Sequence, residues 1–235
     1  MTAFFRPPVW WCLTSLLVTL PAQAEPAAPI APFSAEYALS GSNIPFNIKA
    51  RRTLRAADDG QWYMEVRASN LIGEIRETTQ FRWHGCDTPS ERYSYHRRGL
   101  GRVRDGSVVL DHDAHIARTQ RTGKDDSSFP IPAGATDVLA QTLALQCELM
   151  RGTRSELGYQ VANERRLETM RYRVVGNESV KTGKGRVEAV KLERIRSGDS
   201  ERNTLLWFAP SLDYALVKMI QQDGNDEYSL VLQTP

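Results

Sequence analysis

The sequence is 235 residues long and carries a formal net charge of +2 at pH 7, with 30 Lys and Arg residues against 28 Asp and Glu residues. This balance gives no general attraction to nucleic acid and excludes the strongly basic proteins that bind it through charge alone. Hydrophobic residues make up 41% of the chain, so it can fold around its own core as one domain or as two closely joined sheets.

The first 24 residues predict a secretory signal peptide. Arg6 precedes an apolar run from Val9 to Leu20, and the small-residue site Ala22-Gln23-Ala24 follows. A membrane anchor is the competing interpretation, but the run is shorter than the roughly 18 to 20 residues that a span needs. We therefore expect cleavage after Ala24 and a mature, periplasmic protein that does not span the membrane.

Residues 25–32 are rich in Ala and Pro and predict a flexible leader, which leaves residues 33–235 as a single β-rich domain. From Phe33 onward apolar and polar residues alternate, as in strands that bury one face. The turns Gly41-Ser42-Asn43 and Asp58-Asp59-Gly60 separate the first of these strands, and the last of them ends at Trp83. This stretch predicts an antiparallel meander.

The segment from Pro89 to Lys124 is more polar and predicts weaker strands, with a turn at Asp105-Gly106. It also contains a basic and aromatic group that suits an anionic partner, since arginine pairs with phosphate. The members of this group are Arg92, Tyr93, Tyr95, Arg97, Arg98, Arg102 and Arg104. Because export separates the protein from nucleic acid, the expected partner is a phosphate-bearing lipid or an anionic envelope polymer. A solvated hairpin is the alternative.

Residues 136–151 predict the single long helix of the domain. Thr136 is placed to cap its start, and Gly152 can take the left-handed conformation after its end. Its apolar face predicts that it lies on the concave side of the sheet as a lid. The expected contacts of an apolar or acyl ligand on that face are Leu139, Leu143, Gln146 and Met150.

Gln146 stands in the middle of the apolar stripe. An amide buried there without a partner costs roughly 1 to 3 kcal/mol. Either a backbone carbonyl in a solid core or the head group of a ligand is therefore expected to bond it.

Further strands follow the helix, with turns at Gly176-Asn177, Gly183, Ser197-Gly198-Asp199 and Asp223-Gly224-Asn225. Roughly a dozen strands and one helix predict a mainly β fold. The expected architecture is a large curved antiparallel sheet or an open barrel that one α-helix covers.

Two cysteines, Cys86 and Cys147, remain after signal cleavage. In an oxidising compartment a disulfide is expected, and it would stabilise the fold by about 4 kcal/mol in the chain-entropy model. Two buried free thiols are the alternative. The bond would attach the helix to the end of the strand near Trp83.

No catalytic residue, metal or cofactor is predicted. Asp111, Asp113 and His115 would share one face of a strand and could bind a divalent ion, but a solvated strand end explains them as well. The sequence has no G-x-S-x-G elbow, H-E-x-x-H helix, phosphate loop or C-x-x-C pair. A hydrolase with an unrecognised site therefore stays only an alternative.

The second half of the chain carries a more specific pattern. It comprises Pro130-Ile131-Pro132 before the helix, Leu206-Trp207-Phe208-Ala209-Pro210 with Asp213-Tyr214, and the closing Asp223-Gly224 hairpin. These residues resemble an exported bacterial family, the domain-of-unknown-function family 3108, which supplies no catalytic residues to carry over.

The element pattern is also similar to that of periplasmic lipoprotein carriers, an analogy of fold only. The sequence thus favours a non-catalytic binding or carrier protein for an apolar ligand or a component of the cell envelope. An envelope interaction or structural protein with a solid core is the alternative.

Overall fold

A computed structural model describes residues 28–42, 44–70, 73–99, 102–196 and 202–235. The predicted signal peptide and residues 25–27 of the predicted leader lie outside this part. None of the helices formed by the described residues is long and apolar enough to cross a membrane.

The described chain forms fifteen strands, one α-helix and two short 3-10 helices, in this order: β1 (Phe33–Gly41), β2 (Ile44–Ala56), η1 (Asp58–Gly60), β3 (Trp62–Asn70), β4 (Gly73–Phe81), β5 (Ser90–Gly99), β6 (Arg102–Asp111), β7 (Ile116–Arg121), β8 (Lys124–Pro130), β9 (Thr136–Asp137), α1 (Ala140–Met150), β10 (Leu157–Ala162), β11 (Leu167–Thr182), β12 (Gly185–Ile195), β13 (Arg202–Ala209), η2 (Pro210–Leu212), β14 (Ala215–Asp223) and β15 (Asp226–Thr234). The prediction of a mainly β fold with one helix is confirmed.

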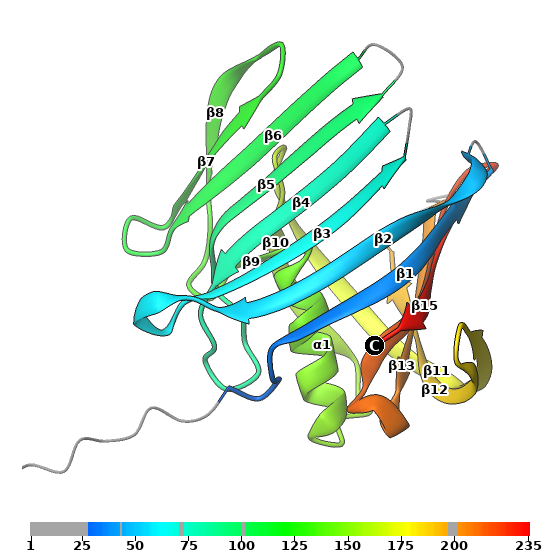
Figure 1. The fold of residues 1–235 in the computed structure, drawn as a ribbon. Helices are drawn as coiled ribbons and strands as arrows, with labels where there is room; N and C mark the ends of the chain where they lie inside the picture. The colour runs from blue at the N-terminus through cyan, green and yellow to red at the C-terminus, as the bar shows by residue number, and fades with distance from the viewer. Residues whose placement is uncertain (1–27, 43, 71–72, 100–101, 197–201) are drawn as a thin grey trace, which may run out of the picture.

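All the strands belong to one sheet, in the order β8-β7-β6-β5-β4-β3-β2-β1-β15-β14-β13-β12-β11-β10-β9. Neighbouring strands are antiparallel, except that β9 and β10 are parallel. Strands joined by short turns must pair in the antiparallel sense, whereas β9 and β10 are connected through α1. The pairing of β1 with β15 joins the N-terminal strands to the C-terminal ones. The sheet curls so that these two groups of strands stand on either side of α1 (Figure 1).

The helix lies inside the curve of the sheet, where strands from both parts of the sheet pack against it (Figure 1). Leu143 and Cys147 pack against the N-terminal strands, while Leu145 and Leu149 pack against β10 to β14. Gln141, a polar residue of the helix, is also buried and accepts a hydrogen bond from the Tyr172 hydroxyl at 3.1 Å. The prediction that one helix covers the concave side of the sheet is confirmed. The expected single apolar face is corrected, because two opposite faces of the helix carry apolar or small side chains.

The start of the helix also differs from the prediction. Residues 136–137 form strand β9, and the helix begins at Ala140. Asp137, not Thr136, caps it: its Oδ1 accepts the backbone N–H groups of Leu139 at 2.7 Å and Ala140 at 3.0 Å. Gly152, with φ of 87°, follows the helix end as predicted.

Two glycines that were predicted to make turns lie inside long strands. At Gly106 in β6 a Cβ atom would stand 3.0 Å from Cγ of Glu164, so the glycine admits the β10–β11 turn. At Gly176 in β11, with φ of 139°, the pairing register with β12 shifts, which makes the residue a β-bulge. Both strands therefore continue where the sequence predicted a break.

The predicted disulfide between Cys86 and Cys147 is confirmed. The two Cα atoms lie 5.4 Å apart and the residues 61 positions apart in sequence. Cys86 follows β4 in a tight turn that the bridge between His84 and Asp87 closes. The bond thus attaches the last turns of α1 to the N-terminal strands.

Candidate functional site

A cavity of about 670 Å³ opens beside the C-terminal end of α1. We call it the apolar cavity, because aliphatic, aromatic and proline side chains make most of its wall. They come from residues 28–32, β1, α1, η2, β14 and β15, and include Ile30, Phe33, Tyr37, Met150, Leu212, Leu216 and Leu232. The polar side chains in the wall are those of Arg52, Gln146, Ser211 and Asp213.

The residues at the mouth of the cavity are exposed, and those at its floor are buried. At the mouth, Met150 is 40% exposed and Ser211 is exposed. At the floor Tyr37, Leu216 and Leu232 are almost fully buried. Ile30, within the predicted leader, is also buried, so residues 28–32 form one wall of the cavity.

The turn after β13 makes one side of the mouth. Pro210 cannot donate to the sheet and ends the strand, and Asp213 and Tyr214 take positive φ angles of 49° and 53°. This conformation directs the carbonyl oxygen of Asp213 to Gln146, whose Nε2 donates to it at 2.9 Å. The structure thus supplies the backbone carbonyl that was one of the two partners expected for Gln146.

The four predicted ligand contacts fall into two environments. Gln146 and Met150 line the apolar cavity. Leu139 and Leu143 are buried in the packed core against the N-terminal strands and do not line it.

Arg52, on β2, is the residue of the cavity that sequence reasoning missed. Side chains of β2 point alternately to the two faces of the sheet, and Ala50 and Leu54 point to the buried face. Arg52, between them, points to the same buried face. The sequence contains a signal for this residue, because an arginine occupies a position of the strand where the alternating pattern calls for an apolar side chain. The side chain is only 3% exposed.

The guanidinium of Arg52 has neutral partners. It donates to the hydroxyl oxygens of Thr142 at 3.0 Å and Tyr37 at 3.5 Å, and it lies 4.0 Å from the sulfur of Met64. Its Cζ stands 5.9 Å from the ring centres of Phe33 and Tyr37. None of the ion pairs within the described part of the chain includes Arg52.

The predicted basic and aromatic group does not form one surface, because its strands alternate between two faces. The pairs Arg97 with Arg104 and Gly99 with Arg102 lie on the same face as Tyr93 and Tyr95, toward the inside of the curve. Arg92 and Arg98 stand on the opposite face, where Arg98 lies 3.8 Å from Glu74.

On this inner face a second cavity of about 570 Å³ is lined by polar side chains, and we call it the basic hollow. Its wall includes Glu77, Tyr93, Tyr95, Arg104, Arg121, Lys124, Glu164 and Arg165. Arg97, Gly99, Arg102 and Arg104 line a neighbouring cavity of about 390 Å³. Arg104 and Lys124 are exposed, so water hydrates these charges.

Two carboxyl groups have shifted pKa values: Glu77, in the wall of the basic hollow, and Asp137, which precedes α1. Burial raises the pKa of Glu77, to which the Tyr93 hydroxyl donates at 3.1 Å. Burial also raises the pKa of Asp137, although hydrogen bonds from Thr79 and the helix start oppose this. Their hydrogen bonds join β4 to β5 at Glu77, and β4 to the start of α1 at Asp137.

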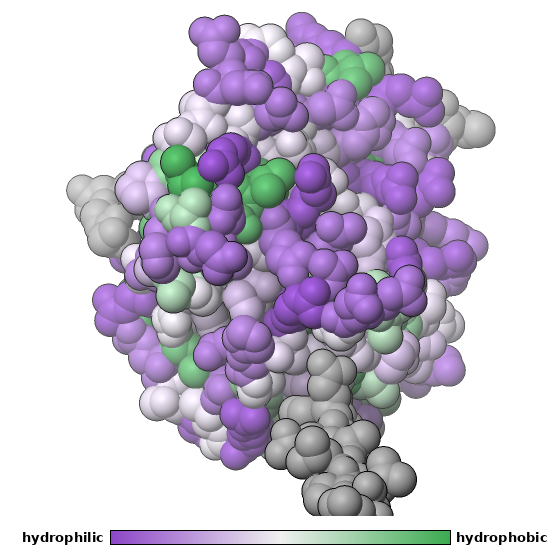
Figure 2. All heavy atoms as spheres, turned by 90° about the vertical axis from the view of Figure 1, so that its left-hand side faces the viewer, coloured by the Kyte–Doolittle hydropathy of each residue, from purple (hydrophilic) through white to green (hydrophobic). Residues whose placement is uncertain are grey.

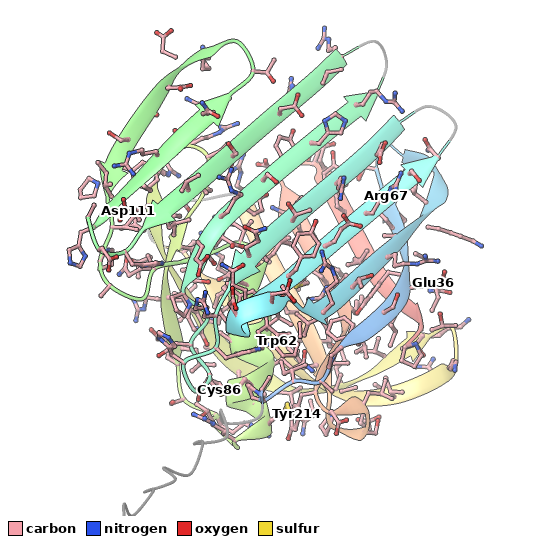
Figure 3. The ribbon with its side chains drawn as sticks, turned by 60° about the vertical axis from the view of Figure 1, so that its left-hand side comes forward. Glu36, Trp62, Arg67, Cys86, Asp111 and Tyr214 are labelled. Carbon is pink, nitrogen blue, oxygen red and sulfur yellow. A yellow bond between two sulfur atoms is a disulfide. The ribbon has the colours of Figure 1, made fainter. Side chains whose placement is uncertain are left out.

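Asp111, Asp113 and His115 do not share one face of a strand. β6 ends at Asp111, and His115 takes a φ of 54° in the following turn. Asp111 accepts the backbone N–H of Ala114 at 2.9 Å and pairs with Arg118 at 3.2 Å. No group of three or more His, Cys, Asp or Glu side chains stands together as metal ligands among the residues described. Figure 3 shows Asp111 far from the end of the molecule where Cys86 and Tyr214 lie.

The side of the molecule that carries β7 and β8 is mostly hydrophilic, with small separate hydrophobic areas (Figure 2). A broad apolar docking surface is therefore not visible on this side. The apolar surface that a ligand could use lies instead in the cavity at the end of α1.

Comparison with known proteins gives a family and a fold. The model of the family described as "Protein of unknown function (DUF3108)" matches residues 46–233. Among solved structures, the chain is similar to a β-barrel-like protein of the domain of unknown function DUF1849 from Brucella abortus, with a TM-score of 0.57 and 10% identity. The match covers 86% of this chain and 95% of the other, and it concerns the fold. No curated protein matches the chain.

Proposed function

The chain belongs to the DUF3108 family, whose function is unknown, and we propose that it is a non-catalytic binding protein for an amphipathic ligand whose chain occupies the apolar cavity. The observation that carries the proposal is this cavity, which has an apolar floor and an open mouth. In keeping with the predicted signal peptide, the protein works in the periplasm on a lipid or another component of the cell envelope.

The size and lining of the cavity support a small ligand. Its volume of about 670 Å³ falls within the roughly 300 to 1,000 Å³ that small-molecule sites occupy. Such sites are mostly apolar and contain a few polar groups that orient the ligand, as Arg52 and Gln146 do here. The volume favours a ligand with a single chain over a lipid with several.

The polar groups of the wall support binding rather than catalysis. Ser211 and Asp213 are exposed at the mouth, and no histidine, cysteine or lysine is among the described residues that line the cavity. Ser211 supplies a hydroxyl group at the mouth, and no hydrogen bond joins it to Asp213 or to another base among the described residues, so it lacks the activating partner that hydrolysis by a serine requires.

Blocking the mouth tests the proposal. Ser211→Trp places a large ring at an exposed position of the mouth and spares the packed core. We expect it to weaken binding of a fluorescent fatty-acid probe at least tenfold while the melting temperature stays near that of the wild type. Ser179→Trp, at an exposed position of β11 outside the cavity, is the matched control.

Equal binding by wild type and Ser211→Trp would reject this cavity as the site. If the wild-type protein binds no such probe, the envelope interaction protein becomes the better hypothesis.

A further inference from the structure

Arg52 is a buried cation that forms no ion pair with any of the described residues. It is 3% exposed, and its neighbours are the side chains of Phe33, Tyr37, Met64 and Thr142. A guanidinium has five N–H donors, and the described residues supply two hydroxyl oxygens and one thioether sulfur. No carboxylate of the described residues forms an ion pair with it, and the carboxylate of Asp213, in the wall of the same cavity, is exposed at the mouth.

Burying an arginine at this position does not benefit the stability of the fold. Moving a charged group from water into a protein interior is unfavourable unless an opposite charge compensates for it. An apolar residue of similar volume would fill the same place without that cost. The other arginines of β2 illustrate the difference: Arg51 is exposed and pairs with Glu36 at 2.8 Å, and Arg55 is exposed and lies over the Tyr63 ring.

The two hydroxyl groups that hold Arg52 are themselves oriented. Tyr37 donates its proton to the carbonyl of Leu216 at 2.8 Å, and Thr142 donates its own to the carbonyl of Leu139 at 2.7 Å. Both hydroxyl oxygens thus present lone pairs to the guanidinium. Strands β1 and β2 and the helix together fix the cation at the floor of the apolar cavity.

We propose that Arg52 binds the anionic head group of a single-chain acidic amphiphile, a carboxylate or a phosphate monoester, at the floor of the apolar cavity. This inference rests on the proposed function and names the class of its ligand. The planar guanidinium matches the two oxygens of a carboxylate or phosphate, and a charge-assisted hydrogen bond is strong where water is excluded. The alkyl chain extends along Tyr37, Leu216 and Leu232 toward Met150 at the mouth.

Competition binding tests the proposal. The neutral dye N-phenyl-1-naphthylamine reports occupancy of the cavity, and dodecanoate, dodecyl phosphate and dodecanol displace it at pH 8 below their micelle concentrations. We expect the wild-type protein to bind at least one of the two anionic compounds at least tenfold more tightly than dodecanol, and the better of them identifies the head group. In Arg52→Met this preference disappears, whereas dodecanol binding is kept.

Arg55→Met is the matched control, since it removes an exposed arginine from the opposite face of the same strand. It retains the preference for the anionic compound. Thermal unfolding of both variants checks that they fold. Arg52→Lys keeps the charge without the planar fork, and an intermediate preference in it supports the role of the guanidinium.

The outcomes separate the inference from the function on which it rests. If dodecanol binds as tightly as both anionic compounds, or if Arg52→Met keeps the preference, the role of Arg52 is wrong while a neutral apolar ligand still fits the cavity. If neither the dye nor any of the three compounds binds the wild type, the proposed function fails and the inference fails with it.

Discussion

The apolar cavity and the basic hollow hold positive charge in opposite ways. In the hollow several cations, among them Arg104 and Lys124, stand exposed to water around polar side chains. In the cavity one guanidinium, that of Arg52, is buried among apolar side chains. The number of charges would favour the hollow as the anion site. The free-energy cost of placing a charge in a protein depends on how much of its hydration is lost. The buried Arg52 loses more hydration than the exposed cations of the hollow, so it is the stronger indication of an anion site.

The helix sharpens this contrast, because it forms part of one site and not of the other. Gln146 and Met150 of α1 line the apolar cavity, and none of the described residues that line the basic hollow comes from α1. Changes that loosen the end of α1 should therefore affect the two sites differently.

The largest effect is expected from removing the disulfide. Replacing both Cys86 and Cys147 with Ser opens a loop of 61 positions and should lower the free energy of unfolding by about 4 kcal/mol. Because Cys147 adjoins Gln146, binding of a fluorescent fatty-acid probe should weaken as well. Urea unfolding and probe titration measure the two effects, and dextran sulfate, a probe for the basic hollow, should bind as before. Unchanged probe binding would show that the disulfide does not shape the cavity.

Leu143 and Met150 of α1 were both predicted to contact a ligand, but substitutions at the two residues should affect stability and binding differently. Leu143→Ala removes a fully buried side chain and should cost about 3 kcal/mol of stability. Met150→Ala alters a side chain that is 40% exposed at the mouth, so it should change stability little and weaken dodecanoate binding several-fold. The same unfolding and displacement measurements compare them, and the reverse pattern would contradict the assignment of floor, mouth and core.

Charge removal in the basic hollow should have a modest, salt-dependent effect. The double variant Arg104→Gln and Arg121→Gln is expected to weaken dextran sulfate binding a few-fold and to reduce its dependence on salt, because exposed charges are screened. Dodecanoate binding at Arg52 should be less sensitive to salt. Arg92→Gln with Arg98→Gln removes equal charge from the outer face, and an equal loss in this control would exclude the hollow as the site.

The smallest effect concerns Glu77. Burial raises its pKa in the folded protein, so the neutral carboxyl group is favoured there. Its contribution to stability is complete below the pKa of the unfolded chain, about 4.3, and is lost as the pH rises through the raised pKa. Glu77→Gln still accepts a hydrogen bond from Tyr93 and has no charge to bury. Its melting temperature relative to the wild type should therefore increase from pH 4 to pH 8. Glu188→Gln, which removes an exposed carboxyl group from β12, is the matched control.

Local patterns predicted much of the fold. Alternation of apolar and polar residues identified most strands, and the pairing of Cys86 with Cys147 followed from the number of cysteines. The same local patterns wrongly predicted turns at Gly106 and Gly176. Glycine is needed at Gly106 because the Glu164 side chain lies close to it, and at Gly176 because the strand has a β-bulge there. The difference between these roles depends on neighbours far away in sequence.

The site was harder to predict for the same reason. Gln146 and Met150 could be selected from a helical pattern, but which apolar residues face a cavity depends on how the sheet curls around α1. Arg52 shows this most clearly. Its place in the alternation marks it as inward-facing. Only the packing of β1 and α1 shows that its partners among the described residues are hydroxyl groups rather than a carboxylate.

The most direct test of the charge at the floor of the cavity is a pH titration of bound dodecanoate that carries ¹³C at its carboxyl carbon, followed by NMR. An adjacent guanidinium favours the charged form of a carboxyl group and lowers its pKa. The bound acid should therefore titrate below the free acid in the wild type, and Arg52→Met should raise its pKa above that of the free acid, since burial alone then acts on it. A bound acid that titrates above the free acid in the wild-type protein would contradict an ion pair with Arg52.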